Sequence, residues 1–130
     1  MKIAGLLTKQ MGPVLLSSCF FVAAGLNHFI NPDFYLPLIP PLFTYPAVIN
    51  IVSGALEIML GLGLLHTNLR SLAIKGLIIL LVLFIPSHVY FIQIGACVLD
   101  GLCVPMWVAY LRLLLIHPLL IFWVLKLSKR

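Results

Sequence analysis

The chain has 130 residues, of which 63% are hydrophobic and only 8% charged. This composition lies far outside the range of soluble globular proteins and leaves room for one membrane domain. The formal net charge of +5 does not predict a nucleic-acid partner, because no basic face with interleaved aromatic residues accompanies it. The first apolar stretch predicts a transmembrane helix near residues 11–30, since it continues past Cys19 and is longer than the apolar region of a signal peptide.

Residues 31–46 follow this helix and hold five of the nine prolines. Proline fixes the backbone and removes a donor, so the segment is not expected to form a regular helix. It is also too apolar for a freely hydrated loop, and we expect it to lie as a cap in the outer membrane interface. Three further helices are predicted near 47–66, 73–95 and 105–125, because about 20 apolar residues span a bilayer core. The predicted fold class is therefore an all-α bundle of four transmembrane helices in a single domain.

The charged residues predict the orientation of this bundle. Asp33 and Asp100 fall on one side of a four-span arrangement, and the basic residues fall on the other. The basic residues on that side are Lys2, Lys9, Arg70, Lys75, Lys126, Lys129 and Arg130. This positive-inside pattern predicts a multi-pass protein of a bacterial inner membrane with both termini in the cytoplasm and with anionic lipid as a contact.

Two prolines, Pro86 and Pro118, lie inside the third and fourth predicted helices. Each removes a backbone hydrogen bond and can kink its helix, which would free a carbonyl to face a cavity. Proline is also commoner in membrane helices than in soluble ones, so a kink without a functional role is the simpler interpretation.

Glu57 and Arg112 interrupt long apolar runs at mid-helix positions. A lone charge at the centre of a membrane helix costs about 2.5 to 3.5 kcal/mol, so each is expected to have a partner or a function. Counting about 1.5 Å per residue from the outer helix ends places both in the outer half of the bundle. The sequence therefore predicts that Glu57 and Arg112 face each other. Such a pair could fix helix register or serve a substrate or a proton, and both alternatives stay open.

One face of the second predicted helix is small and polar. Asn50, Ser53, Gly54, Glu57 and Gly61 recur at helical spacing, so they share a side of the helix. Small residues let a neighbouring backbone approach closely, and we expect this face to point into the bundle.

Every predicted helix places a polar side chain in the outer half, which suggests an outer-facing polar pocket. Its predicted members are Asn27, His28, Glu57, His88 and Arg112. His66 and His117 are not expected there: the first lies at the cytoplasmic end, and the second is five residues beyond Arg112, on another face of an α-helix. A buried histidine is also a common packing residue, so the pocket competes with plain helix packing.

A haem or metal site is disfavoured, because the chain has no Cys-x-x-Cys, no His-x-x-Glu and no two histidines at helical spacing on one helix. Cys97 and Cys103 bracket the second outer loop and are candidates for a disulfide in an oxidising compartment. A structural staple is favoured over an exchangeable redox pair, because no cationic residue lies nearby in the sequence to activate a thiol.

Several segments resemble the DoxX-like family of small four-helix membrane proteins, over nearly the whole chain. They are the run from Gly25 to Tyr35 with Asn27, His28 and Pro32, then Ile39-Pro40-Pro41, Ser53-Gly54-Ala55-Leu56-Glu57, Trp107 and Leu111-Arg112-Leu113. The stretch after Arg112 departs from the family, in which a proline and a glutamine are expected. The resemblance implies a link to membrane redox chemistry, since some relatives are subunits of a thiosulfate:quinone oxidoreductase and others are associated with redox complexes or protein maturation.

The leading expectation is an accessory subunit of a membrane redox or sulfur- and quinone-linked system, with a membrane or periplasmic protein as its partner. Four short helices leave little space for both a cofactor and a substrate, which argues against an independent enzyme. Arg112 would hold a quinone head group or a small anion, while Glu57 and the histidines would orient it or carry protons. The alternatives are a non-enzymatic assembly factor or chaperone for membrane proteins and, third, a small transporter, which the absence of a paired broken-helix repeat disfavours.

Overall fold

The structure is a computed structural model that describes residues 2–129, so Arg130 lies outside the described residues. The described chain is helical throughout, apart from connections and one isolated bridge. Its elements are α1 (Lys2–Ile30), α2 (Pro32–Tyr35), the 3₁₀ turn η1 (Leu36–Leu38), α3 (Pro46–Gly63), α4 (Arg70–Leu83), α5 (Ile85–Gln93), α6 (Met106–Leu111), the π-helical turn η2 (Arg112–Ile116) and α7 (His117–Leu127).

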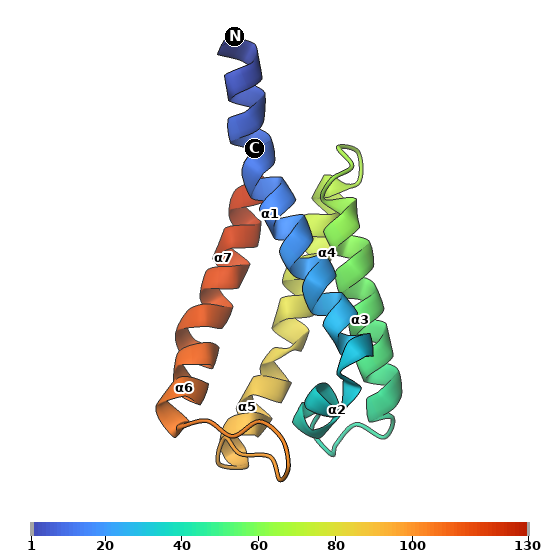
Figure 1. Cartoon of the computed structure of the whole chain (residues 1–130), viewed down its shortest axis with the longest axis vertical. Coiled ribbons are helices and arrows are strands. Elements are labelled where there is room, and N and C mark those ends of the chain that lie inside the picture. The colour runs from blue at the N-terminus through green and yellow to red at the C-terminus, as the bar shows by residue number, and fades with distance from the viewer. Residues whose placement is uncertain (1, 130) are drawn as a thin grey trace.

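Four helical segments are long and apolar enough to cross a membrane: Met11–Ile30, Pro46–Gly63, Arg70–Gln93 and Met106–Leu127. They correspond to the four helices that the apolar runs predict. The two chain ends and the α3–α4 connection lie at one end of the molecule, and α2 and the α5–α6 loop lie at the other (Figure 1). Arg70 begins α4 at the first end, whereas Asp33 in α2 and Asp100 in the loop lie at the second. The fold therefore separates basic from acidic residues along its axis.

Helix α1 packs along α3 through glycines. A Cβ atom added at Gly25 would lie 2.6 Å from the Gly54 carbonyl oxygen, and one added at Gly54 would lie 2.7 Å from His28 Cβ. Neither position has space for a larger side chain, so the two backbones approach closely. The prediction that the small polar face of this helix points inward is confirmed, since Asn50, Gly54, Glu57 and Gly61 are all buried.

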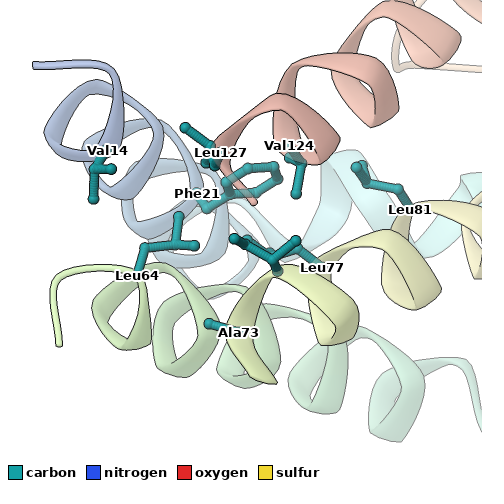
Figure 2. Close-up of a cluster of buried hydrophobic side chains, with 9 residues drawn as sticks. Val14, Phe21, Leu64, Ala73, Leu77, Leu81, Val124 and Leu127 are labelled. Carbon is teal, nitrogen blue, oxygen red and sulfur yellow. The ribbon is translucent and has the colours of Figure 1, made fainter. Parts of the chain in front are cut away.

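An apolar core closes the end of the bundle that holds the termini (Figure 2). Its members come from α1, the end of α3, α4 and α7, and are Val14, Phe21, Leu64, Ala73, Ile74, Leu77, Leu81, Val124 and Leu127. The opposite half holds a smaller cluster around Leu38, Phe91, Ala96 and Ala109. The larger core thus lies toward the termini, and the smaller cluster lies toward α2 and the α5–α6 loop.

The third predicted helix is not continuous, because α4 ends at Leu83 and α5 begins at Ile85. Pro86 occupies the first turn of α5 and has no N–H to donate to the Val82 carbonyl. The proline therefore divides this span into two helices that need not share one axis.

The fourth predicted helix contains a π turn between α6 and α7. The His117 N–H donates to the Arg112 carbonyl, five residues earlier. Pro118, at the start of α7, cannot donate to the Leu114 carbonyl, which removes one ordinary α-helical hydrogen bond. Single π turns inside α-helices are rare and frequently lie at functional sites.

Residues 31–46 form a cap at the end of the bundle opposite the termini, but part of this cap is helical. Pro32 and Pro37 stand in the first turns of α2 and η1, where the missing N–H costs nothing. The expectation that the segment contains no regular helix was therefore wrong for residues 32–38. The first helix also begins earlier than predicted, at Lys2.

The α5–α6 loop is a compact hairpin, in which Cys97 and Cys103 are joined by a disulfide. The Val98 N–H donates to the Leu102 carbonyl at 2.9 Å, and the Val104 N–H donates to the Ala96 carbonyl at 3.0 Å. This loop connects the helix that carries His88 to the one that leads into Arg112.

Candidate functional site

His28 is held in one orientation by Asn50, which α3 presents across the glycine contact. The Asn50 Nδ2 donates to the His28 carbonyl at 3.0 Å, and the Asn50 Oδ1 lies 2.7 Å from His28 Nδ1. Because the amide nitrogen is used on the carbonyl, the amide oxygen must accept, and His28 Nδ1 must carry a proton. His28 Nε2 is thereby left to face another partner.

That partner is Glu57, whose Oε2 lies 3.3 Å from His28 Nε2. Both side chains are buried, and a bare carboxylate facing an unprotonated nitrogen would be costly there. The 3.3 Å approach is an ion-pair contact, and Glu57 Oε2 accepts no hydrogen bond from the described residues.

The predicted Glu57–Arg112 ion pair was wrong. Glu57 forms its ion pair with His28, and among the described side chains, those of Lys9 and residues 11–129, no ion pair or hydrogen bond joins Arg112 to a partner. The reason lies in helix adjacency: Glu57 follows Gly54 by about one turn, and Gly54 packs against α1 at His28. The buried face of α3 is thus occupied by α1, not by the helix that carries Arg112.

A cavity of about 590 Å³ lies toward the end of the bundle that holds α2 and the α5–α6 loop, with walls from α1, the cap, α3, α4, α5, η2 and α7. Most of its lining is apolar, including Phe84 and Phe91. Its polar lining residues are His28, Tyr35, Asn50, Ser53, Ser87, His88, Arg112 and His117. A mainly apolar chamber with a few convergent polar groups is the usual form of a small-molecule site.

Of the five predicted pocket residues, His28, His88 and Arg112 line this cavity, whereas Asn27 and Glu57 do not. Glu57 lies behind His28 as its ion-pair partner. Asn27 acts through Tyr35: its Nδ2 donates to the Tyr35 hydroxyl at 2.7 Å, and the Tyr35 ring stacks on His28 with 3.7 Å between ring centroids. Both residues therefore position groups of the wall.

His117 is a cavity residue that the sequence prediction excluded. Its Nε2 donates to the Leu81 carbonyl, close to the break between α4 and α5, and its ring centroid lies 4.6 Å from that of His88. The exclusion assumed an unbroken α-helix, in which side chains five residues apart lie on different faces. The π turn instead brings residue 117 beneath residue 112. Pro118 is the sequence signal that could have indicated this change.

Tyr35 was also missed, because the residues of the cap were expected to lie in the outer membrane interface. The helical turn α2 directs it toward α1, where it stacks on His28. Ser87 was missed as well, and its position next to Pro86 is the one feature of the sequence that could have pointed to it.

Comparison with known proteins places the chain in a family. Residues 17–128 match the model of a domain of unknown function, DUF8561. The chain belongs to the DUF8561 family. No curated protein and no solved structure matches this DUF8561 chain. The matched segment contains all the residues that line the cavity.

The electrostatics of the DUF8561 cavity are dominated by Arg112. Of the described residues that line this cavity, Arg112 alone is a Lys, Arg, Asp or Glu, and a guanidinium stays protonated throughout the physiological range. Arg112 is partly buried against an apolar wall. Among residues 2–129, no group of three His, Cys, Asp or Glu side chains is arranged to hold a metal ion. The arrangement can therefore accept an oxygen-bearing head group through Arg112 and neighbouring hydroxyl and imidazole groups.

Proposed function

We propose that this DUF8561 protein is an integral protein of a bacterial inner membrane, with both termini in the cytoplasm. Its cavity holds the oxygen-bearing head group of a small molecule such as a quinone. The protein works as an accessory subunit of a membrane redox or sulfur- and quinone-linked system, as the resemblance to the DoxX-like family implies. The four apolar spans and the separation of basic from acidic ends support the membrane placement.

The observation that carries this proposal is the state of Arg112. Its guanidinium lies on the wall of a largely apolar cavity and has no anionic partner within the described chain. A cation at this depth is costly unless something compensates it. Carbonyl or anionic oxygens are the natural complement of the guanidinium, because it offers five N–H donors and accepts nothing. A bound head group would supply the partner that Glu57 does not.

The other polar groups of the wall have complementary roles. The hydroxyls of Tyr35, Ser53 and Ser87 can donate to or accept from the head group. His28 reaches the cavity on one side and contacts Glu57 on the other. This pair can give or take a proton when the protonation of the head group changes.

The test is binding of a water-soluble benzoquinone to the purified protein in lipid nanodiscs. Wild type is compared with Arg112→Gln and Arg112→Lys, and Lys75→Gln serves as the control because Lys75 is exposed and lies outside the wall. A hydrogen bond to a charged group contributes about 1.5 to 3 kcal/mol, so Arg112→Gln should weaken binding at least tenfold. The lysine variant should be intermediate, because it keeps the charge and loses the planar donor set.

Equal binding by wild type and Arg112→Gln would refute the proposed role of Arg112, as would the failure of the wild type to bind at all. The accessory role is tested separately, by mild purification from native membranes. A co-purifying partner with a flavin or haem absorption spectrum is expected. Isolation of the protein alone, under conditions that preserve other membrane complexes, would contradict that role.

A further inference from the structure

We infer that the cavity opens sideways into the hydrocarbon of the bilayer, between α3 and the end of α4. Its ligand is then an amphiphile, with an oxygen-bearing head at Arg112 and an acyl or isoprenoid chain that leaves through this opening. The inference rests on the proposed membrane function and adds to it the class of ligand and its route of entry.

The opening is marked by four large apolar side chains, which we call the lateral rim: Val48, Val52, Leu56 and Leu83. All four line the cavity and are also exposed on the outside of the bundle. Val52 is 48% exposed and Leu83 is 64% exposed. Leu80 and Leu81, three and two residues earlier in α4, line the same cavity but are buried. The part of the wall that α4 supplies is therefore buried at these two leucines and exposed at Leu83.

The break in the third span explains why the bundle opens there. On the side of the termini, α4 packs closely on α3: a Cβ at Gly76 would lie 2.7 Å from a Leu60 methyl carbon, and one at Gly63 would lie 3.1 Å from the Ala73 Cβ. Past Leu83 the chain continues as α5, which packs against η1, α6 and η2. Helices α3 and α4 are thus packed together on the side of the termini, and this packing ends at the break after Leu83.

The depth of the lateral rim decides what lies outside it. Val52 is six residues into α3, and Leu83 is ten residues before the end of α5. At about 1.5 Å per residue these positions lie roughly 9 Å and 15 Å from the outer helix ends, within the hydrocarbon of a bilayer. The cap contributes Leu38, Ile39 and Phe43 to the outer part of the wall. An exit at this depth leads to lipid chains, where an apolar tail is soluble and a hydrophilic solute is not.

The experiment narrows the lateral rim with an indole and compares ligands that differ only in their chain. Val52→Trp and Leu83→Trp are the test variants. Met59→Trp and Ile79→Trp are matched controls on the same two helices, since Met59 is 67% and Ile79 is 60% exposed and neither lines the cavity. The probes are a decyl-substituted benzoquinone against the same ring bearing a methyl group, and palmitate against acetate, all measured in nanodiscs. Thermal unfolding and gel filtration verify that each variant is folded.

We expect at least one chain-bearing probe to bind the wild type. Val52→Trp and Leu83→Trp should weaken its binding about tenfold or more, while the corresponding short probe changes less than twofold in the same variants. Both controls should bind like the wild type. The inference is overturned if the two rim variants leave the chain-bearing probe unaffected, or if they weaken long and short probes equally.

The proposed function and this inference can fail separately. Binding that depends on Arg112 but shows no response to the rim variants would leave the function standing and remove the lateral opening. If the rim variants weaken the binding of a chain-bearing probe but Arg112→Gln does not, the lateral opening stands and the proposed role of Arg112 is removed. Binding of palmitate without either quinone would keep the opening and reject the quinone as head group. No binding by any probe would overturn both.

Discussion

His117 lies one π turn beyond Arg112, and its backbone N–H donates to the Arg112 carbonyl. This hydrogen bond changes the phase of the fourth span, so that residues five apart both reach one cavity wall. It also places the His117 ring against that of His88. The polar wall of the cavity therefore depends on a backbone feature.

Replacing Pro118 with alanine tests this dependence. The alanine N–H can donate to the Leu114 carbonyl and favours ordinary α-helical hydrogen bonds. Loss of the π turn would rotate Arg112 by about 100° relative to His117. We expect the melting temperature to stay the same or rise, and quinone binding in nanodiscs to weaken at least threefold. Leu119→Ala is the control, because Leu119 is exposed and outside the wall. Unchanged binding would mean that the π turn does not position Arg112.

The glycine contact between α1 and α3 predicts a sharp difference between two Gly→Ala variants. In Gly54→Ala the new methyl group would collide with His28 Cβ and with the Gly25 carbonyl. Overpacking of this kind typically costs about 1 to 3 kcal/mol. In Gly12→Ala nothing lies within 4 Å, and alanine is the better helix former by about 0.5 to 1 kcal/mol. Thermal or denaturant unfolding should show Gly54→Ala destabilised and Gly12→Ala neutral or stabilised.

Glutamine and leucine at position 57 should differ in stability. A glutamine amide can donate to His28 Nε2, so Glu57→Gln gives a neutral, hydrogen-bonded pair and should change the free energy of unfolding by less than about 1 kcal/mol. Glu57→Leu leaves a buried ring nitrogen without a partner and should cost about 1 to 3 kcal/mol. Equal destabilisation by both would show that the charge of Glu57, not its hydrogen-bonding capacity, stabilises the fold. Denaturant unfolding in detergent provides the measurement.

Two double-mutant cycles separate the observed ion pair from the predicted one. The cycle of His28→Ala with Glu57→Ala should give a coupling energy above about 0.5 kcal/mol, because the two side chains are in contact. The cycle of Glu57→Ala with Arg112→Ala should give a coupling near zero. A larger coupling between Glu57 and Arg112 than between Glu57 and His28 would restore the pairing that the sequence suggested.

The disulfide between Cys97 and Cys103 closes a short loop between α5 and α6. Loop-closure entropy gives a stabilisation of about 2 kcal/mol for a loop of this size. The double variant Cys97→Ser with Cys103→Ser should therefore unfold at a lower temperature, while Cys19→Ser should not, because Cys19 is a free, exposed thiol. Addition of a reductant should lower the melting temperature of the wild type and leave that of the double variant unchanged. A wild type that is insensitive to reductant would contradict the stabilising role.

The four spans and the inward face of α3 could be predicted from sequence, because bilayer thickness fixes helix length and the helical repeat fixes which residues share a face. The ion-pair partner of Glu57 could not be predicted from sequence. The identity of this partner depends on which helix packs against Gly54, and the periodicity of one helix does not encode which helix is its neighbour. His117 was missed for a different reason, since a single π turn changes the phase that periodicity assumes. The position of Tyr35 could not be predicted because it depends on the short helix α2. The proline of this helix favours a helical start as well as a break.

The location of the His28–Glu57 contact has a consequence for biogenesis. Both residues belong to the first two spans to be synthesised, so the acidic side chain finds its compensation before the second half of the chain exists. In the proposed membrane setting, these two spans can leave the translocon as a hairpin in which Glu57 already faces His28. Arg112 enters later, without a protein counter-ion. An N-terminal fragment ending after α3 should therefore insert efficiently on its own, whereas insertion of the last span should be the step most sensitive to Arg112.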